Sequence, residues 1–414
     1  MEGFYTMTEL APAIEGVVPP HVPPELVKDL TIGRGFVTER LPHEIVDEIH
    51  RDFPPVFYAP NLMNGGGWVF RRSEDQLAIW QDAEHFSSQQ IQPFAELAGG
   101  DWTMIPVEQD PPEHEFYRRL LMPFFSPKAA ADLDDKIMEY ARSQIMKFQH
   151  KGKCEFMKEF SLIFPSLIFL ELMGMPVERF EEFVEWENIM LRDDDMDRVA
   201  SAVGTVVNYF EQEIDARGES PGDDLLGFAM TAEVDGRKMT KNELVGLSFN
   251  LFLAGLDTVS AHLGHIFRHL AENPDQQEEL RKNPDLIDQS ITEFMRAFGA
   301  VTITRTCVKD AVVAGVEIKN GDKVAVSTAL ASRDPEVYDS PSEIIWGRPP
   351  SRSLSFGTGI HVCLGIHIAR REIRAALKLF LELLPPFRIE NGATIESDLG
   401  TVMMPFTLPL EWDV

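Results

Sequence analysis

A single cysteine stands in a glycine-rich turn that runs directly into a stretch with helical periodicity. Phe356 to Gly365 reads Phe-Gly-Thr-Gly-Ile-His-Val-Cys-Leu-Gly, and the periodic stretch follows at residues 366–374. Glycines at 357, 359 and 365 can adopt positive φ and let a flat partner approach the backbone. A helix beginning near Leu364 would direct its free N–H groups and positive dipole end at Cys363. These surroundings stabilise a thiolate, although a buried structural cysteine is the alternative.

His114 and Arg118 form a second pattern, in a segment that opens with Asp110-Pro111-Pro112. Asp110 can cap a helix and the prolines suit its first turn. The two side chains, four residues apart, would then share one helix face. Spacing alone favours a surface face that forms ion pairs.

The longest helical stretch, Val245 to Leu270, is interrupted by Ala254-Gly255-Leu256-Asp257-Thr258. A glycine, an acid and a hydroxyl are unfavourable inside an apolar helix, and Thr258 can divert a backbone carbonyl. Such breaks of local rules tend to mark function, and a mild kink with a satisfied aspartate is the alternative. Histidines 262, 265 and 269 follow, but no carboxylate joins them at ligand spacing, so we do not expect a zinc site.

The remaining sequence predicts a mainly α protein with a small β region, because helical periodicity is plentiful and strand-like alternation sparse. One hairpin is expected between Val312 and Val326, turning at Asn320-Gly321. We expect one catalytic domain over residues 1–414, with residues 1–40 packed on it as a proline-containing leader. Three scattered cysteines indicate a reducing, cytoplasmic setting. No run reaches the roughly 20 apolar residues of a membrane span, and a net charge of −29 disfavours nucleic acid.

The string Phe-Gly-x-Gly-x-His-x-Cys-Leu-Gly resembles the haem-ligand signature of the cytochrome P450 monooxygenases. Three further strings match that family in order: Asp-Pro-Pro-x-His-x-x-x-Arg from Asp110, Ala-Gly-x-Asp-Thr from Ala254, and Glu-x-x-Arg from Glu293. From about residue 60 onward the chain is similar to the camphor 5-monooxygenase subgroup. The resemblance implies a triangular helical fold around haem b.

The resemblance also assigns roles to these patterns. Cys363 would be the axial thiolate of the haem iron. Thr258 would hydrogen-bond bound dioxygen on a locally widened helix, while Asp257 would feed protons inward. Arg192 would pair with Asp257 and gate proton entry, with a surface arginine as the alternative.

Three sets of supporting residues follow from the same resemblance. The haem propionates would be held by His114, Arg118, Arg305 and His361. The haem-binding turn would include Phe356, Gly357, Leu364 and Gly365. A buried ion network supporting the core would join Glu293, Arg296 and Arg348.

The resemblance further implies a mainly apolar pocket for an alicyclic or terpenoid-like compound such as camphor, cineole or a norisoprenoid. Trp102 stands where the subgroup has a tyrosine that binds the camphor ketone, so camphor itself is in doubt. Asn250 stands where the subgroup has a leucine, which would put an amide in or beside the pocket. A core amide is the alternative for Asn250. The predicted lining is Trp102, Met104, Asn250, Leu253, Ala254, Val301, Thr401 and Val402.

Electrons must come from a partner, because the chain shows no flavin or nicotinamide domain. The resemblance implies a [2Fe–2S] ferredoxin with an NADH-dependent reductase, and an acidic partner fits a basic patch. The expected patch is Arg72, Arg118, Arg119, Arg370 and Arg371. We expect a monomer. A peroxide-driven peroxygenase and a non-enzymatic haem protein are the alternatives.

Overall fold

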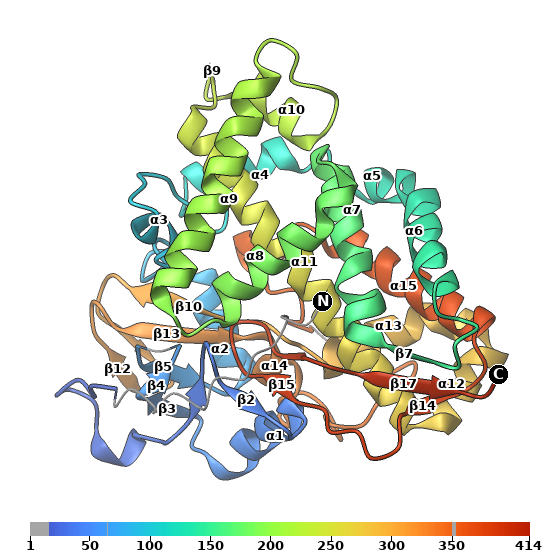
Figure 1. Cartoon of the computed structure of the whole chain (residues 1–414). Helices are drawn as coiled ribbons and strands as arrows, with labels where there is room; N and C mark the ends of the chain where they lie inside the picture. The colour runs from blue at the N-terminus through green and yellow to red at the C-terminus, as the bar shows by residue number, and fades with distance from the viewer. Residues whose placement is uncertain (1–15, 64, 350–352) are drawn as a thin grey trace.

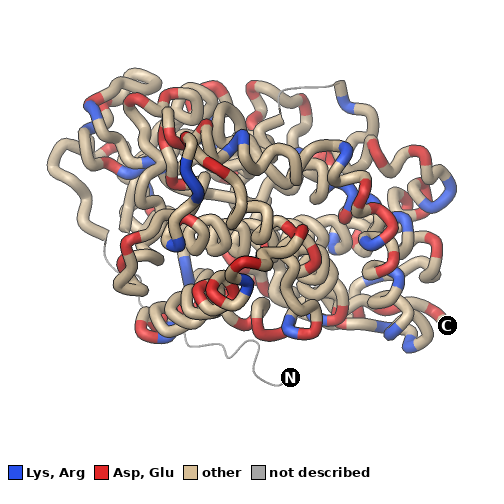
Figure 2. Tube along the Cα trace, turned by 90° about the horizontal axis from the view of Figure 1, so that it is seen from above, with Lys and Arg blue, Asp and Glu red and all other residues tan. Residues whose placement is uncertain are grey.

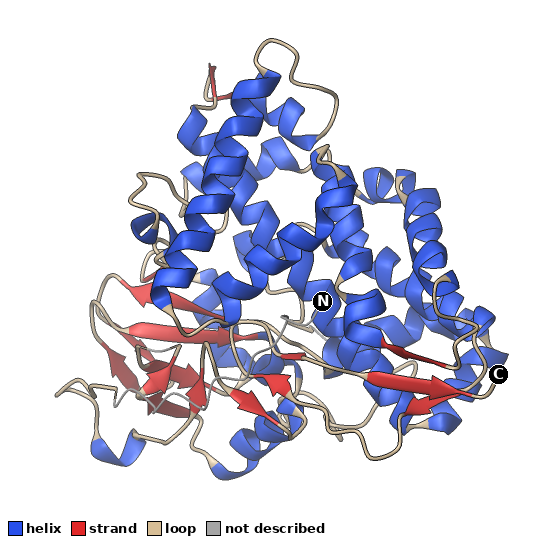
Figure 3. Cartoon of the chain, in the orientation of Figure 1, coloured by secondary structure: helices blue, strands red, loops and turns tan. Residues whose placement is uncertain are grey.

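The computed structural model of the chain describes residues 16–63, 65–349 and 353–414. It is 50% helix and 14% strand, which confirms a mainly α fold with a small β region. Figure 3 shows the helices filling most of a triangular outline, with strands gathered along its base. The first fifteen residues of the predicted leader lie outside the described residues. The rest of the leader packs on the molecule, since Val22, Leu30 and Ile32 are buried.

The helices make up the upper part of the triangle in Figure 1. Their bounds are α1 Pro42–Asp52, α2 Ser73–Gln81, α3 Phe94–Leu97, α4 Glu113–Leu121, α5 Pro127–Asp132, α6 Asp134–Met146, α7 Ile163–Met173, α8 Phe180–Arg192, α9 Met196–Arg217, α10 Leu225–Thr231, α11 Lys241–Glu272, α12 Pro274–Lys282, α13 Ile287–Ala297, α14 Thr328–Ser332 and α15 Ile366–Leu383.

Helix α11 runs through the middle of the molecule, in contact with α7, α8 and α9. It begins at a capping box, in which the Thr240 hydroxyl accepts from the Glu243 N–H and the Glu243 carboxylate accepts from the Thr240 N–H. Among the described residues, α11 alone is long and apolar enough to cross a membrane, but 72% of that window is buried inside the molecule. Such burial is typical of the core helix of a globular domain.

Gly255 explains how α7 approaches α11 so closely. A Cβ at this position would lie 2.7 Å from Cδ2 of Phe169, closer than side-chain atoms pack. The glycine inside the apolar helix therefore has a packing reason besides any chemical one.

Most strands form small sheets along the base of the triangle, while the pair Glu233–Val234 and Arg237–Lys238 lies near its top (Figure 1). A five-stranded sheet has the order β3 Val56–Ala59, β5 Gly67–Phe70, β13 Lys323–Ser327, β10 Thr302–Cys307 and β6 Phe86–Ser87. There are two three-stranded sheets. One has the order β14 Phe387–Ile389, β17 Pro409–Trp412 and β7 Lys153–Glu155. The other has the order β16 Met404–Pro405, β15 Ser397–Asp398 and β2 Val37–Thr38. The pairs are β1 Thr31–Ile32 with β4 Asn61–Leu62, β8 Glu233–Val234 with β9 Arg237–Lys238, and β11 Ala311–Val313 with β12 Val316–Ile318.

The predicted hairpin turn at Asn320-Gly321 is wrong. The hairpin joins β11 and β12, and its turn is Ala314-Gly315, where both residues have positive φ. The segment after Gly321 instead forms β13, which pairs with β10 and β5 in the larger sheet. Burial on that sheet decides the pairing, since Val324, Ala325 and Val326 are all buried.

Charge is spread over the whole surface. Figure 2 shows acidic positions along most of the trace, with basic positions between them. The net charge of −29 therefore comes from a general excess of carboxylates.

Candidate active site

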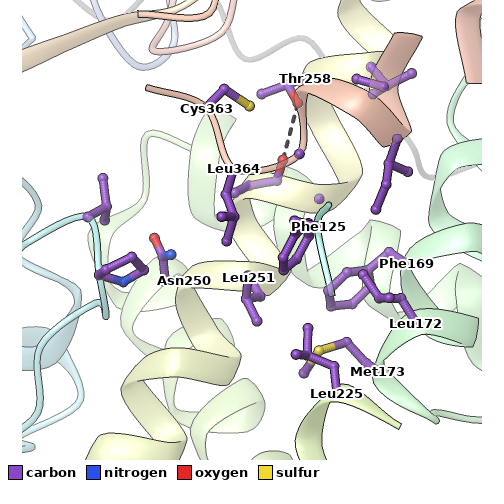
Figure 4. Close-up of a pocket in the computed structure, with 18 of the residues that line it drawn as sticks. Phe125, Phe169, Leu172, Met173, Leu225, Asn250, Leu251, Thr258, Cys363 and Leu364 are labelled. Atoms are coloured by element: carbon purple, nitrogen blue, oxygen red, sulfur yellow. Dashed lines mark hydrogen bonds between the residues drawn. The ribbon is translucent and has the colours of Figure 1, made fainter. Parts of the chain in front are cut away.

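A cavity between α4, α7, α11 and α15 reaches the sulfur of Cys363. It encloses about 1060 Å³ that protein atoms leave empty, counting the part open to solvent. Figure 4 shows Cys363 and Thr258 at one end of the cavity, and Phe169, Met173 and Leu225 at the other.

The turn before α15 presents the sulfur to the cavity. Gly357 and Gly359 have φ values of 66° and 68°, and the Cys363 N–H donates to the carbonyl of Phe356 at 2.8 Å. Helix α15 begins at Ile366 rather than near Leu364. Gly365 has a φ of −80° instead of the expected positive value, because it is the residue that caps this helix.

The N-terminus of α15 and one arginine act on the Cys363 sulfur. Burial raises the pKa of the thiol, while the N–H of Gly365, the charge of Arg118 and the N–H of Ile366 lower it. These contacts favour the thiolate form of Cys363 when a positively charged group binds beside the sulfur. Leu364 also lines the cavity beside the sulfur.

Four basic side chains gather at one edge of the cavity. His114 and His361 have ring centroids 4.4 Å apart, and both line the cavity with Arg118. Arg305, on β10, lies close enough to His361 for its charge to lower the pKa of the imidazole. Burial, followed by Arg305, His114 and Arg118, lowers the pKa of His361 to about 2.

These basic side chains lack an acid that neutralises them. Both ring nitrogens of His114 and Nη2 of Arg305 are buried with no hydrogen-bond partner within the described ranges. Asp110 acts on Arg305, but its carboxylate accepts hydrogen bonds from the Ser87 hydroxyl and the Ser88 N–H. Asp110 therefore does not cap α4 as predicted. Donors of this kind suit two carboxylate groups of a ligand, and with a thiolate in the same cavity they fit haem.

Helix α11 carries two polar side chains to the site. The Thr258 hydroxyl lines the cavity and donates to the carbonyl of Ala254 at 3.1 Å. The helix stays α-helical through this segment, so the widening implied by the resemblance is absent here. Asp257 is buried and faces α8 rather than the cavity.

Arg192 bridges two buried carboxylates. Its Nη2 donates to Oδ1 and Oδ2 of Asp257 at 2.7 and 2.6 Å, and its Nε lies 3.3 Å from Oδ2 of Asp398. The side chain is only 8% exposed, so the alternative of a surface arginine is wrong.

Glu293 lies between two arginines behind the site. Arg296 donates to its two carboxylate oxygens at 2.8 Å each, and Arg348 Nε donates to Oε1 at 3.0 Å. Arg296 also donates to the carbonyls of Ser332 and Pro341, which ties α13 to the chain after α14.

Only two of the eight predicted substrate residues, Asn250 and Ala254, line this cavity. Trp102 packs on Phe249 with ring centroids 4.7 Å apart, and its buried Nε1 has no hydrogen-bond partner among the residues described. The others that do not line it are Met104, Leu253, Val301, Thr401 and Val402.

The five arginines of the predicted patch differ in their surroundings. Arg119 is exposed, whereas Arg118 lines the cavity and Arg370 donates to Thr292. Arg72 is held by Asp75 and Arg371 by Asp134. The patch is therefore less basic than the sequence suggests.

Several residues of the site were not predicted. The polar ones are Ser88, whose hydroxyl lies 3.0 Å from Nε2 of His361, and the buried acids Glu187, Asp398 and Glu372, and the apolar ones include Phe169, Met173 and Leu225. Each contacts residues far away in the chain, and no local pattern marks them.

Comparisons with known proteins agree with this geometry. The cytochrome P450 family profile matches residues 190–391. A probable cytochrome P450 127A1 of Sinorhizobium fredii is 36% identical over 402 residues, covering 95% of this chain and 97% of its own. Linalool 8-monooxygenase of Pseudomonas putida is 25% identical, over 85% of this chain and 91% of its own.

Two crystal structures have the same fold. CYP101J2 and cytochrome P450 CYP101C1 each superpose with a TM-score of 0.86, at 31% and 30% identity, covering 96% of this chain and all of theirs. The chain therefore belongs to the cytochrome P450 family, and is a monooxygenase whose cofactor is a haem b bound by a cysteine thiolate.

Proposed function

We propose that this monooxygenase hydroxylates a small alicyclic or terpenoid-like compound such as camphor, cineole or a norisoprenoid. The observation that carries the proposal is an apolar cavity at Cys363 with a single amide, Asn250, among its lining residues outside the basic edge. Thr258 and the buried Glu372 also line the cavity. A mainly apolar wall with few polar groups suits a compact hydrocarbon skeleton that bears one oxygen. The likeness to camphor-type CYP101 structures and to a linalool monooxygenase supports the same class.

The haem-binding roles follow from the donors at the cavity. Cys363 would be the axial ligand, in the turn formed by Phe356, Gly357, Leu364 and Gly365. The two propionates would be held by His114, Arg118, Arg305 and His361. Haem supplies the activation of dioxygen when it is bound.

Helix α11 carries the two residues that would deliver protons in this reaction. Asp257 would carry protons and Thr258 would hand them on through its hydroxyl. Arg192 holds both oxygens of Asp257 in the structure, which is a closed state of the proposed gate. The hydroxyl of Thr258 must leave the Ala254 carbonyl before it can donate into the cavity.

Electrons would come from a [2Fe–2S] ferredoxin reduced by an NADH-dependent reductase. Arg119 is the exposed member of the arginine patch and therefore its strongest candidate contact. The cytoplasmic location, the single domain and the monomeric state stay predictions.

A spectral titration tests the substrate class. Camphor, cineole, ionones and simple alicyclic ketones and alcohols are added to the ferric protein, and we expect one of these groups to convert it from low to high spin. In an Asn250→Leu variant the oxygenated ligands should bind several-fold more weakly, while Asn208→Leu, an exposed change on α9, should bind as the parent does.

Two outcomes would contradict the proposal. If none of these compounds shifts the spectrum, the compact terpenoid class is wrong. If peroxide alone supports faster product formation than ferredoxin with NADH, the peroxygenase alternative replaces the proposed electron supply.

A further inference from the structure

A buried cluster of charged side chains lies behind Asp257, where α8, α11 and β15 meet. Arg192 holds Asp257 and reaches Asp398, and the side chains of these two acids are 1% and 4% exposed. Glu187, one turn before Arg192 on α8, is 2% exposed and acts on the same aspartate. Arg34, in the segment between β1 and β2, lies close enough to Asp398 for its charge to lower the pKa of that acid.

The cluster holds three carboxyl groups and two guanidinium groups. If every group were charged, it would carry one uncompensated negative charge in the interior of the protein. Burying such a charge costs several kcal/mol, and a carboxyl group avoids the cost by keeping its proton. Charge balance therefore requires one neutral acid in the cluster.

Burial raises the pKa of Asp398 to about 7, but Asp398 lies 3.3 Å from Nε of Arg192. Glu187 is therefore the acid best placed to be neutral. Its side chain is 2% exposed, and within the part of the chain that the structure describes its Oε1 has no hydrogen-bond partner. The backbone N–H of Asp257 lies close to this carboxyl group and favours its charged form. Burial and then the charge of Asp257 raise the pKa of Glu187 well above its usual value, against the opposing effect of Arg192.

Asp398 has a different part in the cluster. It accepts the Gly400 N–H at 2.9 Å and already lies 3.3 Å from Nε of Arg192. When Arg192 releases Asp257, its guanidinium group can stay paired with Asp398 instead of becoming unpaired in the interior. This second partner lowers the cost of opening the Asp257 ion pair.

We propose that Glu187 is a positioning residue that stores the proton which Asp257 delivers. The proposal rests on the proposed role of Asp257. In the step, Arg192 withdraws toward Asp398, the O–H bond of Glu187 breaks, and an O–H bond forms on Asp257. The negative charge moves from Asp257 to Glu187, where the nearby Asp257 N–H favours the charged form, and a proton from solvent later restores the neutral acid.

Infrared spectroscopy of the resting holoenzyme tests the storage directly. We expect the C=O stretching band of a protonated carboxyl group at pH 7 that shifts in D₂O. Glu372 is also buried, and burial raises its pKa to about 8, so the test is a difference spectrum. The band should appear in the difference between the parent and Glu187→Gln. It should be missing from the difference between the parent and Glu185→Gln, a matched change at an exposed position of the same helix. If the unsubstituted protein shows no such band, the proposal is overturned even if the Gln variant fails to fold.

Kinetics test whether the stored proton is used. The readout is NADH oxidation driven by ferredoxin in the presence of the compound that gives the largest spectral shift. Donor residues commonly contribute 10²–10⁴-fold, so a residue acting behind the donor should contribute less, about tenfold for Glu187→Gln. The solvent isotope effect on NADH oxidation should be larger in Glu187→Gln than in the parent. Glu187→Asp should restore part of the rate of NADH oxidation.

The controls separate this inference from the proposed function. A rate and isotope effect of Glu187→Gln equal to those of Glu185→Gln overturns the proposal while Asp257→Asn still slows the reaction. If Asp257→Asn has no effect, the delivery step itself is wrong, and the infrared band shows separately whether Glu187 holds a proton.

Discussion

At the scale of single residues, short motifs and distant contacts differ in how well the sequence predicts them. The cysteine turn, the Asp257-Thr258 pair and the Glu293-Arg296 pair are each local, and spacing along one helix or turn already indicates which side chains meet. Glu187 and Asp398 are acids in unremarkable surroundings. Their burial depends on how α8 and β15 pack against α11, which no short pattern encodes.

Thr258→Ala should separate NADH consumption from product formation. The variant lacks the hydroxyl that would donate into the cavity, so reduced oxygen should leave as hydrogen peroxide while electrons continue to enter. Product and peroxide are measured per NADH oxidised. Thr205→Ala is the control, because Thr205 donates in the same way to the carbonyl of Ser201 but lies exposed on α9. Unchanged coupling in Thr258→Ala would remove this hydroxyl from the mechanism.

At the scale of elements, α11 is held by backbone contacts as well as by side chains. A Cβ on Gly246 would lie 2.0 Å from the backbone oxygen of Thr103, which cannot rotate away. Helix length and type were predictable from apolar periodicity, but this contact joins the helix to a loop more than 140 positions earlier. The misplaced hairpin has the same origin, since the sheet that takes up β13 outweighs the local turn preference of Asn320-Gly321.

Gly246→Ala should lower the free energy of unfolding. Alanine gains about 1 kcal/mol of helix propensity, but overpacking against fixed atoms commonly costs about 1–3 kcal/mol, and a 2.0 Å contact lies at the severe end. Urea unfolding measures the net loss. Gly204→Ala on α9, where a Cβ meets nothing within 4 Å, should stabilise the protein. Equal stability of both variants would contradict the contact.

Glu293→Gln should destabilise the junction of α13 with the chain after α14. It leaves the buried guanidinium of Arg296 without its carboxylate, and breaking a buried ion pair in this way costs roughly 3–5 kcal/mol. Urea unfolding of the variant is compared with that of Glu181→Gln, an exposed change on α8.

The same variant should show a characteristic pH dependence. Burial raises the pKa of Glu293, but hydrogen bonds from Arg296, Ile345 and Arg348 outweigh it and hold the pKa below its usual 4.5. Because the folded-state pKa is depressed, the stabilisation is fully present above the ordinary pKa and is lost as pH falls through the folded value. A difference between parent and variant that persists unchanged in strong acid would contradict this assignment.

At the scale of the whole molecule, a strongly acidic chain would have to attract the acidic ferredoxin that is proposed as its electron donor. Exposed charges interact over about 10 Å at 0.1 M salt and about 3 Å at 1 M, so the KM for ferredoxin should rise with ionic strength. Arg119→Glu should raise the KM for ferredoxin several-fold at low salt and by a smaller factor at high salt. Arg51→Glu, on α1, is the control. A KM independent of salt would argue against docking on the patch.

The four basic side chains at the cavity edge also bear on how the enzyme is made. Until an anionic cofactor arrives, burial lowers the pKa of His114, Arg118, Arg305 and His361. The newly synthesised chain therefore folds around basic groups whose charged forms are destabilised. A ligand at a thousand times its Kd adds about 4 kcal/mol to stability. We expect cells short of haem to lose the unfilled chain to proteolysis, so that the amount of enzyme follows the supply of its cofactor.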